Sequence, residues 1–375
     1  MIKYLGSKKR LLPVLGDLFT ASGARTALDL FTGTTRVAQE LKRRGGLVTA
    51  VDVSRYSEVF AQCWIETAAD DVDTHELADA LHHLAALRGT PGYFTETFCV
   101  QSRYLQPKNG ERVDAIRDAL QREYSNTPLF PILLTSLILA ADRVDSTTGL
   151  QMAYLKHWAP RAYKDLELRA PDLIDGQGTA IRGDAAVMAP VLGSFDFAYL
   201  DPPYNQHRYY TNYHVFETLV AWDRPEHYGI ACKRIDSRHA ATKSVFNDKR
   251  NMAAALQRTI AAVDAEIVVL SYNDEAWVSL AELTEMCAAH GHVELLAFDS
   301  RRYIGAQIGI YNPDGEKVGK VSHLRNLEYL LVAGPARKVR RISDAVRDRA
   351  VSSTALNPDA TPRPVRRSPV RAHAG

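Results

Sequence analysis

The sequence predicts an α/β protein with a doubly wound, mostly parallel sheet that is interrupted by a helical segment. Residues 26–53 alternate a strand, a glycine-bearing turn, a helix and a second strand, which is the pattern of a βαβ unit. Strand and helix patterns alternate again from residue 195 to residue 332, whereas the segment between these regions lacks clear strands. Such alternation is typical of a parallel sheet covered by helices.

The length and composition favour a globular enzyme-sized protein. The chain has 375 residues, of which 46% are hydrophobic and 24% are charged, so it is not disordered throughout. The longest mostly apolar run, residues 129–141, is about half of what a membrane-spanning helix needs, and the first residues start no signal peptide. We therefore expect a soluble, cytoplasmic protein with no membrane contact.

Cysteines and charge exclude several classes of function. The four cysteines are far apart and form no Cys-x-x-Cys pair, so we expect neither a metal site nor a disulfide framework. None follows a proline, so the Pro-Cys nucleophile of a cytosine-C5 methyltransferase is missing. The net charge is +2, but seven net positive charges lie from Pro335 onward, which leaves −5 for the body. A nucleic-acid surface on the body must therefore be a local patch.

The elements follow in a simple order. The βαβ unit consists of residues 26–31, 32–35, 37–44 and 47–52. The insert, residues 66–175, is acidic at its start and carries apolar helical segments around 77–87, 113–124 and 129–144. The later strands and helices cover 195–200, 214–222, 252–263, 265–271, 280–290, 293–298 and 327–332.

These patterns predict three units along the chain. Residues 1–65 and 176–334 form the α/β core, and residues 66–175 form the helical insert. Residues 335–375 are Arg-, Ala- and Pro-rich with no apolar period, so we expect a basic disordered tail.

A turn after the first strand has the features of a nucleotide-like binding site. The segment from Asp29 to Gly33 ends a buried strand and opens a helix, where free backbone N–H groups meet a ligand in α/β proteins. Asp52 lies 19 residues after Gly33, at the end of the next strand, where a carboxylate can accept both ribose hydroxyls. A lone glycine after a strand is more often a plain turn, so this signal is weak by itself.

The segment Asp201-Pro202-Pro203-Tyr204 follows an apolar strand directly and raises that signal. The exocyclic amine of adenine is a poor nucleophile, because its lone pair is delocalised into the ring. The Asp201 carboxylate and the Pro202 carbonyl can accept its two hydrogens, and the prolines stiffen the turn that aims them. The Tyr204 ring offers a stacking face for a base swung out of the helix. An ordinary Pro-Pro turn with a capping aspartate is the simpler alternative.

With these motifs the chain resembles the D12 class of DNA adenine-N6 methyltransferases, which includes the Dam-like enzymes. The matches, in the order of the family, are Tyr4-Leu5-Gly6-Ser7-Lys8, Asp29-Leu30-Phe31-Thr32-Gly33, Asp52, Arg182-Gly183-Asp184, and Asp201-Pro202-Pro203-Tyr204 continuing into Asn205 and Asn212-Tyr213-His214. The resemblance spans about residues 1–334 and is specific, because five motifs agree in order and spacing. It implies the fold of the class I S-adenosylmethionine-dependent methyltransferases, with the insert as the target-recognition segment.

The resemblance also implies the roles of individual residues. The expected cofactor-binding residues are Tyr4, Gly6, Lys8, Asp29, Phe31, Gly33, Asp52 and Asp184. Among them, Lys8 and Asp29 would lie near the methionine end of S-adenosylmethionine, Asp52 on the ribose and Asp184 on the adenine ring. The expected catalytic residues, which hold the target base, are Asp201, Pro202 and Tyr204.

Some residues have simpler explanations or depart from the family. Lys8 can be a solvated lysine, and Asp184 can be a turn residue. The family often has a second glycine two residues after the first, where this chain has Thr35, which is strained if that position needs a positive φ. We interpret His207 and His214 as packing or hydrogen-bonding residues, because this chemistry can lose its proton after methyl transfer.

Basic residues that could meet DNA lie in two segments. Those in the insert are Arg103, Lys108, Arg143, Lys156, Arg161 and Lys164, and those after the catalytic motif are Lys233, Arg234, Arg238 and Lys243. We expect most to be solvated or to contact phosphates, which gives affinity without sequence information.

The sequence therefore predicts a site-specific methyltransferase that moves a methyl group from S-adenosylmethionine to adenine N6 in duplex DNA, without a metal. We expect a monomer whose partners are duplex DNA and, in a restriction-modification system, a cognate endonuclease. One alternative is an RNA guanine-N2 methyltransferase, although the Tyr-Leu-Gly-Ser-Lys start and more than a hundred residues between the two motifs disfavour it. The other is a DNA-binding protein that lost catalysis, which the intact Asp-Pro-Pro-Tyr motif disfavours.

Overall fold

A seven-stranded sheet with the order β3-β2-β1-β4-β7-β11-β8 forms the centre of the computed structural model. The structure describes residues 2–4, 8–203, 208–273, 277–301, 310–311, 317–319 and 325–351. Strand β11 lies antiparallel to β7 and β8, and the four other pairings in the sheet are parallel. The predicted doubly wound, mostly parallel sheet is confirmed.

Six of the seven strands match predicted ones closely, and β3 is a strand that the sequence did not predict. The seven strands are β1 (Thr26–Asp29), β2 (Leu47–Asp52), β3 (Gly178–Arg182), β4 (Ser194–Leu200), β7 (Asp264–Asn273), β8 (His292–Arg301) and β11 (Arg325–Gly334). Alternate residues of each inner strand face opposite layers, so Ala27 belongs to one core cluster and Leu28 to the other. Because both faces are covered, these strands are apolar nearly throughout.

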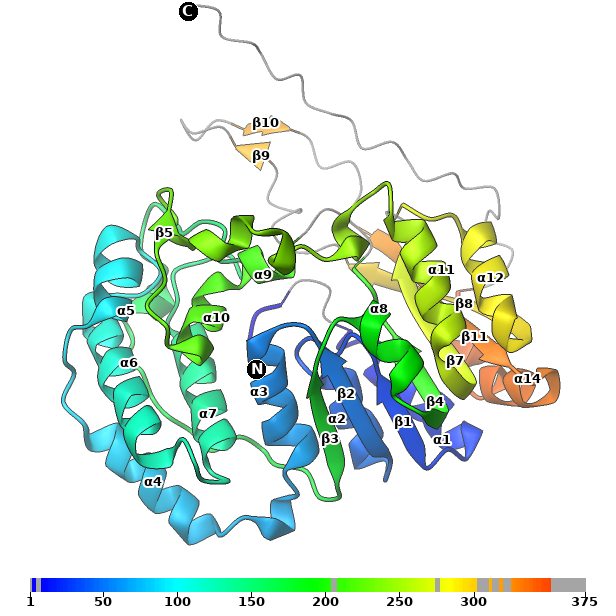
Figure 1. Cartoon of the computed structure of the whole chain (residues 1–375), viewed down its shortest axis with the longest axis horizontal. Coiled ribbons are helices and arrows are strands. Elements are labelled where there is room, and N and C mark those ends of the chain that lie inside the picture. The colour runs from blue at the N-terminus through cyan, green and yellow to red at the C-terminus, as the bar shows by residue number, and fades with distance from the viewer. Residues whose placement is uncertain are drawn as a thin grey trace, which may run out of the picture.

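Helices cover both faces of the sheet (Figure 1). One face packs against α1 (Leu12–Ser22), α2 (Arg36–Arg43) and α14 (Ala336–Asp344). The other packs against α8 (Ala185–Met188), α11 (Met252–Ala262) and α12 (Leu280–Cys287).

A helical lobe lies beside the sheet (Figure 1). Between β2 and β3, where every residue is described, the chain forms helices and no strand; these include α3 (Arg55–Ala61), α4 (Thr74–Ala86), α5 (Tyr93–Thr95), α6 (Pro107–Ala119) and α7 (Phe130–Arg143). Two later helices, α9 (Tyr209–Asn212) and α10 (His214–Ala221), extend this lobe. The buried Arg117 on α6 donates hydrogen bonds to the carbonyls of Leu219 and Val220 at 2.8 and 3.0 Å, which ties α10 to the lobe.

The first part of the segment expected to be a disordered tail is a packed helix, so that expectation is wrong for residues 336–351. Val339, Ile342 and Val346 are fully buried and join the core cluster that α1 covers. Val339 and Ile342 lie on one face of α14 and Val346 follows just after its end, while the arginines between Val339 and Ile342 face outward. The sequence did not predict this helix, because its few apolar residues are separated by many charged ones.

Within the described part of the chain, no helix is long and apolar enough to cross a membrane.

Candidate active site

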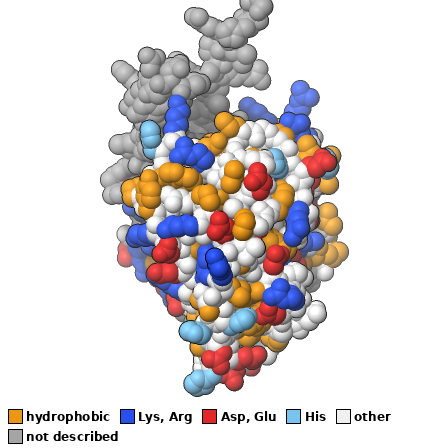
Figure 2. Space-filling model, turned by 90° about the vertical axis from the view of Figure 1, so that its left-hand side faces the viewer, with side chains coloured by type: hydrophobic (Ala, Val, Ile, Leu, Met, Phe, Trp, Pro, Cys, Tyr) orange, Lys and Arg blue, Asp and Glu red, His pale blue; other side chains and the backbone are white. Residues whose placement is uncertain are grey.

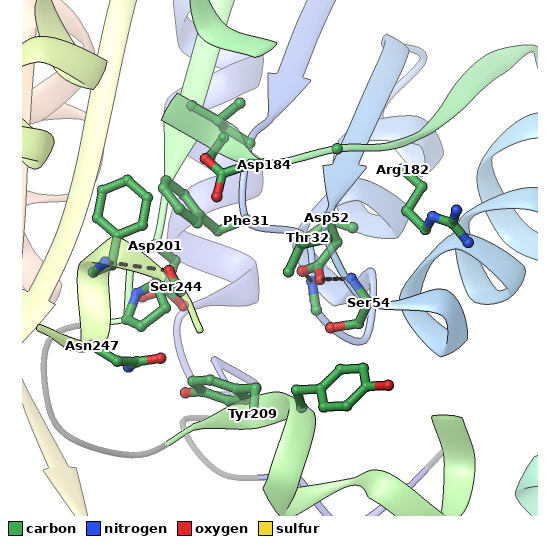
Figure 3. Close-up of a pocket in the computed structure, with 18 of the residues that line it drawn as sticks. Phe31, Thr32, Asp52, Ser54, Arg182, Asp184, Asp201, Tyr209, Ser244 and Asn247 are labelled. Carbon is green, nitrogen blue, oxygen red and sulfur yellow. Dashed lines mark hydrogen bonds between the residues drawn. The ribbon is translucent and has the colours of Figure 1, made fainter. Parts of the chain in front are cut away.

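The carboxyl ends of β1 and β4 meet at the point where the strand order reverses. Asp29 on β1 is paired with Tyr199 on β4, and β2 lies on the other side of β1. Open α/β sheets bind ligands at such switch points. A cavity of about 430 Å³ lies there (Figure 3).

The cavity brings together most of the residues that the sequence predicted. Tyr4, Lys8, Asp29, Phe31, Gly33, Asp52, Asp184 and Asp201 all line it. Pro202 is buried beside Asp201, and Pro203 contributes to the lining. Gly6 and Tyr204 lie outside the described residues, as does His207.

Asp29 has one oxygen engaged by the protein and one oxygen without a partner. Its Oδ2 atom accepts hydrogen bonds from the Thr32 hydroxyl at 2.9 Å and from the Ala38 amide at 3.0 Å. Its Oδ1 atom is buried and has no hydrogen-bond partner among the described residues. Burial raises the pKa of Asp29 to about 7, although these two hydrogen bonds oppose the shift.

Asp52 joins the glycine turn to the end of β2. Its carboxylate accepts the Gly33 amide and the Ser54 amide, both at 2.9 Å (Figure 3). Burial raises the pKa of Asp52, and these amides oppose the shift. Gly33 has φ +52°, and a Cβ there would lie 2.9 Å from the Tyr4 hydroxyl. The position therefore needs glycine both for its backbone conformation and for space.

Thr35 occupies the position where the family often has a second glycine, and it does adopt a positive φ. Its φ and ψ are 60° and 13°, the left-handed region, which is strained for a β-branched residue. Its hydroxyl donates to the Thr34 carbonyl at 2.7 Å and accepts from the Gln39 side chain at 2.9 Å. These bonds hold the strained conformation.

Asp184 and Phe31 form another side of the cavity. One carboxylate oxygen of Asp184 accepts the Ala186 amide at 2.8 Å, so the residue caps α8 as well as lining the cavity. The Phe31 ring packs edge-on against Phe246, with centroids 5.1 Å apart. Sequence reasoning missed Phe246, which lies in a short helical turn without a motif.

The catalytic-motif aspartate belongs to an ionic cluster. Lys8 places its Nζ 3.1 Å from Asp201 Oδ1 and 2.9 Å from Glu328 Oε2. Burial raises the pKa of Asp201 to about 6; the Lys8 ammonium opposes the shift, and the Glu328 carboxylate adds to it. Lys8 is therefore a buried, paired lysine and not a solvated one. Glu328 is 320 residues from Lys8 and had no local signal in the sequence.

Arg36 is a second residue that sequence reasoning missed. It lies at the start of α2 and lines the cavity. Its Nε atom is buried without a hydrogen-bond partner among the described residues, and desolvation lowers its pKa. The cavity thus holds a cationic donor that the described protein leaves unsatisfied.

His214 and Arg234, which follow the catalytic motif in sequence, are buried and bonded within the protein. His214 is fully buried, its Nε2 lies 2.8 Å from the Gln151 carbonyl oxygen, and desolvation lowers its pKa to about 3. It is thus neutral at ordinary pH. Arg234 is also buried and makes paired contacts of 2.7 Å with Asp223 and Asp236. It is therefore not available to bind phosphates, whereas the adjacent Lys233 makes no ion pair among the described residues.

The sheet order and the carboxylates at the strand ends define the chain as a class I S-adenosylmethionine-dependent methyltransferase by fold. The model of the D12 class N6 adenine-specific DNA methyltransferases matches residues 4–286, and the chain belongs to that family. The family uses S-adenosylmethionine as its methyl donor.

Curated relatives of the chain are modification enzymes. Type II methyltransferase M.NlaIII of Neisseria lactamica is 28% identical over 319 residues, which cover 80% of this chain and 92% of that protein. Modification methylase StsI of Streptococcus sanguinis is 28% identical over 375 residues, covering 94% of this chain and 55% of that protein. Type II methyltransferase M.FokI of Planomicrobium okeanokoites is 28% identical over 313 residues, covering 77% and 47%. The chain thus spans about half the length of the StsI and FokI enzymes.

Proposed function

We propose that the chain is a site-specific DNA methyltransferase that transfers a methyl group from S-adenosylmethionine to adenine N6 in duplex DNA. The observation that carries this proposal is the position of Asp201, which follows β4 and lines the same cavity as Asp29 and Asp52. Membership of the adenine-specific family supports the same assignment.

The unsatisfied atoms of the cavity fit the cofactor. S-adenosylmethionine carries an ammonium and a carboxylate at its methionine end, and a methyl group on a positively charged sulfur, which it supplies for transfer. Asp29 Oδ1 is an acceptor without a partner among the described residues, and Arg36 is a donor in the same situation. We propose that Asp29 binds the ammonium and Arg36 binds the carboxylate, while Asp52 binds the ribose and Asp184 the adenine ring.

At the catalytic turn, the residues of the chain act on the amine of the target adenine. The Asp201 carboxylate and the Pro202 carbonyl accept its hydrogens, which favours a pyramidal nitrogen with an available lone pair. With the cofactor bound, the N6–carbon bond would form as the sulfur–carbon bond breaks; the sulfur would keep that electron pair as a neutral thioether, and the extra proton on N6 would pass to solvent. We assign Lys8 to keeping Asp201 ionised, because its ammonium lies 3.1 Å from that carboxylate. Tyr204 is proposed to stack on the flipped base.

The product of the reaction tests this function. The full chain is incubated with S-adenosylmethionine carrying an isotopic label on its methyl group and, in parallel, with duplex DNA or RNA. We expect labelled N6-methyldeoxyadenosine from duplex DNA after digestion and mass spectrometry. Labelled N2-methylguanosine from RNA would support the alternative RNA enzyme, and binding of DNA without any labelled nucleoside would indicate a silent binding protein.

We further propose that residues 66–175 read the target sequence and that the chain belongs to a restriction-modification system with a cognate endonuclease. The placement of this segment between the cofactor and catalytic motifs, and the names of the relatives, support this role. Replacing the segment by that of a relative should move the methylated site and leave the modified atom unchanged. Sequencing of methylated DNA would decide, and an unchanged site in an active chimera would contradict the assignment.

A further inference from the structure

A second hollow adjoins the cavity and, unlike it, has no carboxylate among its described lining residues. It has a volume of about 490 Å³ and is lined by Met152, Arg208, Thr211, Asn212, Tyr228, Lys233, Ser237, Arg238 and Lys243. Arg208 and Lys243 line both hollows, so the two are direct neighbours. We call this second hollow the basic groove.

The basic groove is positively charged and carries no acidic lining residue among those described. Arg208, Arg238 and Lys243 are exposed and Lys233 is half-buried, and none of them makes an ion pair within the described part of the chain. Cations that are left without carboxylate partners on one surface attract a polyanion.

Neighbouring side chains shape the groove. The Arg238 guanidinium lies over the Tyr228 ring at 3.8 Å, and the Tyr228 hydroxyl lies 3.0 Å from the Ser237 hydroxyl. Asn212 is 3% exposed, and its Nδ2 has no hydrogen-bond partner among the described residues. Such a buried donor is costly unless a ligand supplies an acceptor.

The start of the helical lobe is acidic. The acidic residues at the start of the lobe, Glu66, Asp70, Asp71, Asp73, Glu76 and Asp79, are exposed. Figure 2 shows acidic side chains gathered at the lower end of this face, whereas Lys and Arg side chains, mixed with acidic ones, are spread over its middle and upper parts. This asymmetry steers a polyanion to the end of the lobe that holds the cavity.

We propose that the basic groove binds backbone phosphates of the DNA duplex beside the adenine that enters the cavity. This inference rests on the proposed function, because it assigns a surface to the same substrate. Lys233 and Arg238 bind phosphate oxygens, and Asn212 donates to one of them. These contacts fix the position of the duplex and carry no sequence information.

Salt dependence tests the groove directly. The double variant Lys233→Glu/Arg238→Glu is compared with the parent by titrating a fluorescent duplex of mixed sequence at several salt concentrations. Each phosphate contact contributes about 0.9 to the slope of log affinity against log salt, so the slope should fall by about 2. The KM for DNA should rise while kcat at saturating DNA stays near the parent value.

A charge-matched control separates a groove from general electrostatics. The double variant Arg88→Glu/Arg258→Glu makes the same change in net charge at two exposed residues outside the groove. It should keep the parent slope. Equal slopes for the two double variants, or a fall in kcat with unchanged KM in the groove variant, would overturn the proposal.

Asn212→Asp probes the groove without changing its size. The substitution replaces the amide donor by a carboxylate and breaks no described hydrogen bond of Nδ2. We expect weaker DNA binding with an unchanged affinity for S-adenosylmethionine; unchanged DNA binding in the folded variant would remove Asn212 from the site. If the parent methylates no adenine, the proposed function fails. If the parent is active and the groove variants bind DNA as tightly as the parent, the groove proposal alone is refuted.

Discussion

The cavity and the basic groove are adjacent but differ in charge: the cavity lining combines carboxylates with cations such as Lys8 and Arg36, whereas the described lining of the groove has cations and no carboxylate. The cavity is lined by four carboxylates of the cofactor and catalytic motifs, Asp29, Asp52, Asp184 and Asp201, whereas the groove is lined by four cations. The carboxylates stand at or just after strand ends, while Arg208 directly precedes α9 and the three other cations lie in short turns and a two-residue strand between α10 and α11. In the function proposed above, this face binds a sulfonium and an amine in the cavity and a phosphate chain in the groove.

The two regions also differ in exposure, which decides how they respond to their surroundings. Burial raises the pKa values of Asp29, Asp52 and Asp201, so the cavity responds to protons. Three of the groove cations are exposed, so their attraction for DNA is screened by salt. Changes in pH and in salt therefore separate the chemistry of the cavity from the docking of DNA.

The largest effect is expected from Asp201→Ala. The variant removes an acceptor that matters as charge develops on the amine, so kcat should fall by about 10²–10³, as for loss of one oxyanion donor. The affinity for S-adenosylmethionine should change much less, because Asp29 and Asp52 remain. Calorimetric titration measures the affinity for S-adenosylmethionine, and single-turnover methylation of duplex DNA measures the rate of methyl transfer. The exposed Asp165→Ala is the control, and a parent rate in Asp201→Ala would refute the catalytic assignment.

The C-terminal segment tests whether the groove or the tail carries the DNA-binding charge. Deleting residues 336–375 removes the buried Val339 and Ile342 and should lower the free energy of unfolding by about 3 kcal/mol or more. Deleting residues 352–375 should leave the melting temperature and methylation unchanged and weaken non-specific binding. Thermal melts and salt titrations measure both. If this short deletion flattens the salt dependence and the groove variants do not, the phosphate contact lies in the tail.

Sequence reasoning succeeded where a local pattern fixes the position of a side chain. Asp29, Asp52 and Asp201 follow recognisable strands, and parallel strands bring their carboxyl ends to one edge. Glu328 had no such signal, because its place depends on β11 lying antiparallel between β7 and β8. The roles of Arg234 and Lys233, which are adjacent in sequence, depend on which of them finds carboxylate partners.

Glu328→Gln tests how Glu328 and Lys8 together set the charge of Asp201. The variant replaces the carboxylate that pairs with Lys8 by a neutral amide oxygen, which can still accept from the ammonium but weakens the contact by up to about 1.5 kcal/mol, so kcat should fall by at most roughly tenfold. Because the Glu328 charge raises the pKa of Asp201, the acid limb of kcat/KM should move below its parent position near pH 6. Glu328→Asp keeps the charge and should keep that limb. If Glu328 had only a structural role, Glu328→Gln would lower kcat/KM without shifting the acid limb of its pH profile.

The affinity for cofactor should depend on pH through Asp29. Below about pH 7 the buried carboxyl holds a proton, which must leave when an ammonium binds, so affinity should rise by up to tenfold per pH unit and level off above pH 7. The same raised pKa means that the contribution of Asp29 to stability decreases as pH rises from about 4 to about 7, because only the unfolded state ionises there. Calorimetric titration at several pH values measures the affinity. In the Asp29→Asn variant the slope should vanish; a persisting slope would assign it to another group.

The smallest effect is expected at the strained turn of the cavity. Thr35→Gly releases about 1–2 kcal/mol of left-handed strain but loses the hydroxyl bonds to Thr34 and Gln39, worth about 1 kcal/mol net, and adds backbone entropy to the unfolded chain. These terms nearly cancel, so the melting temperature should change by only a few degrees. Thr34→Gly is the matched control, because Thr34 is buried and has no positive φ to relieve. It should destabilise the protein more than Thr35→Gly, and equal losses in the two variants would show that the strain at Thr35 is energetically small.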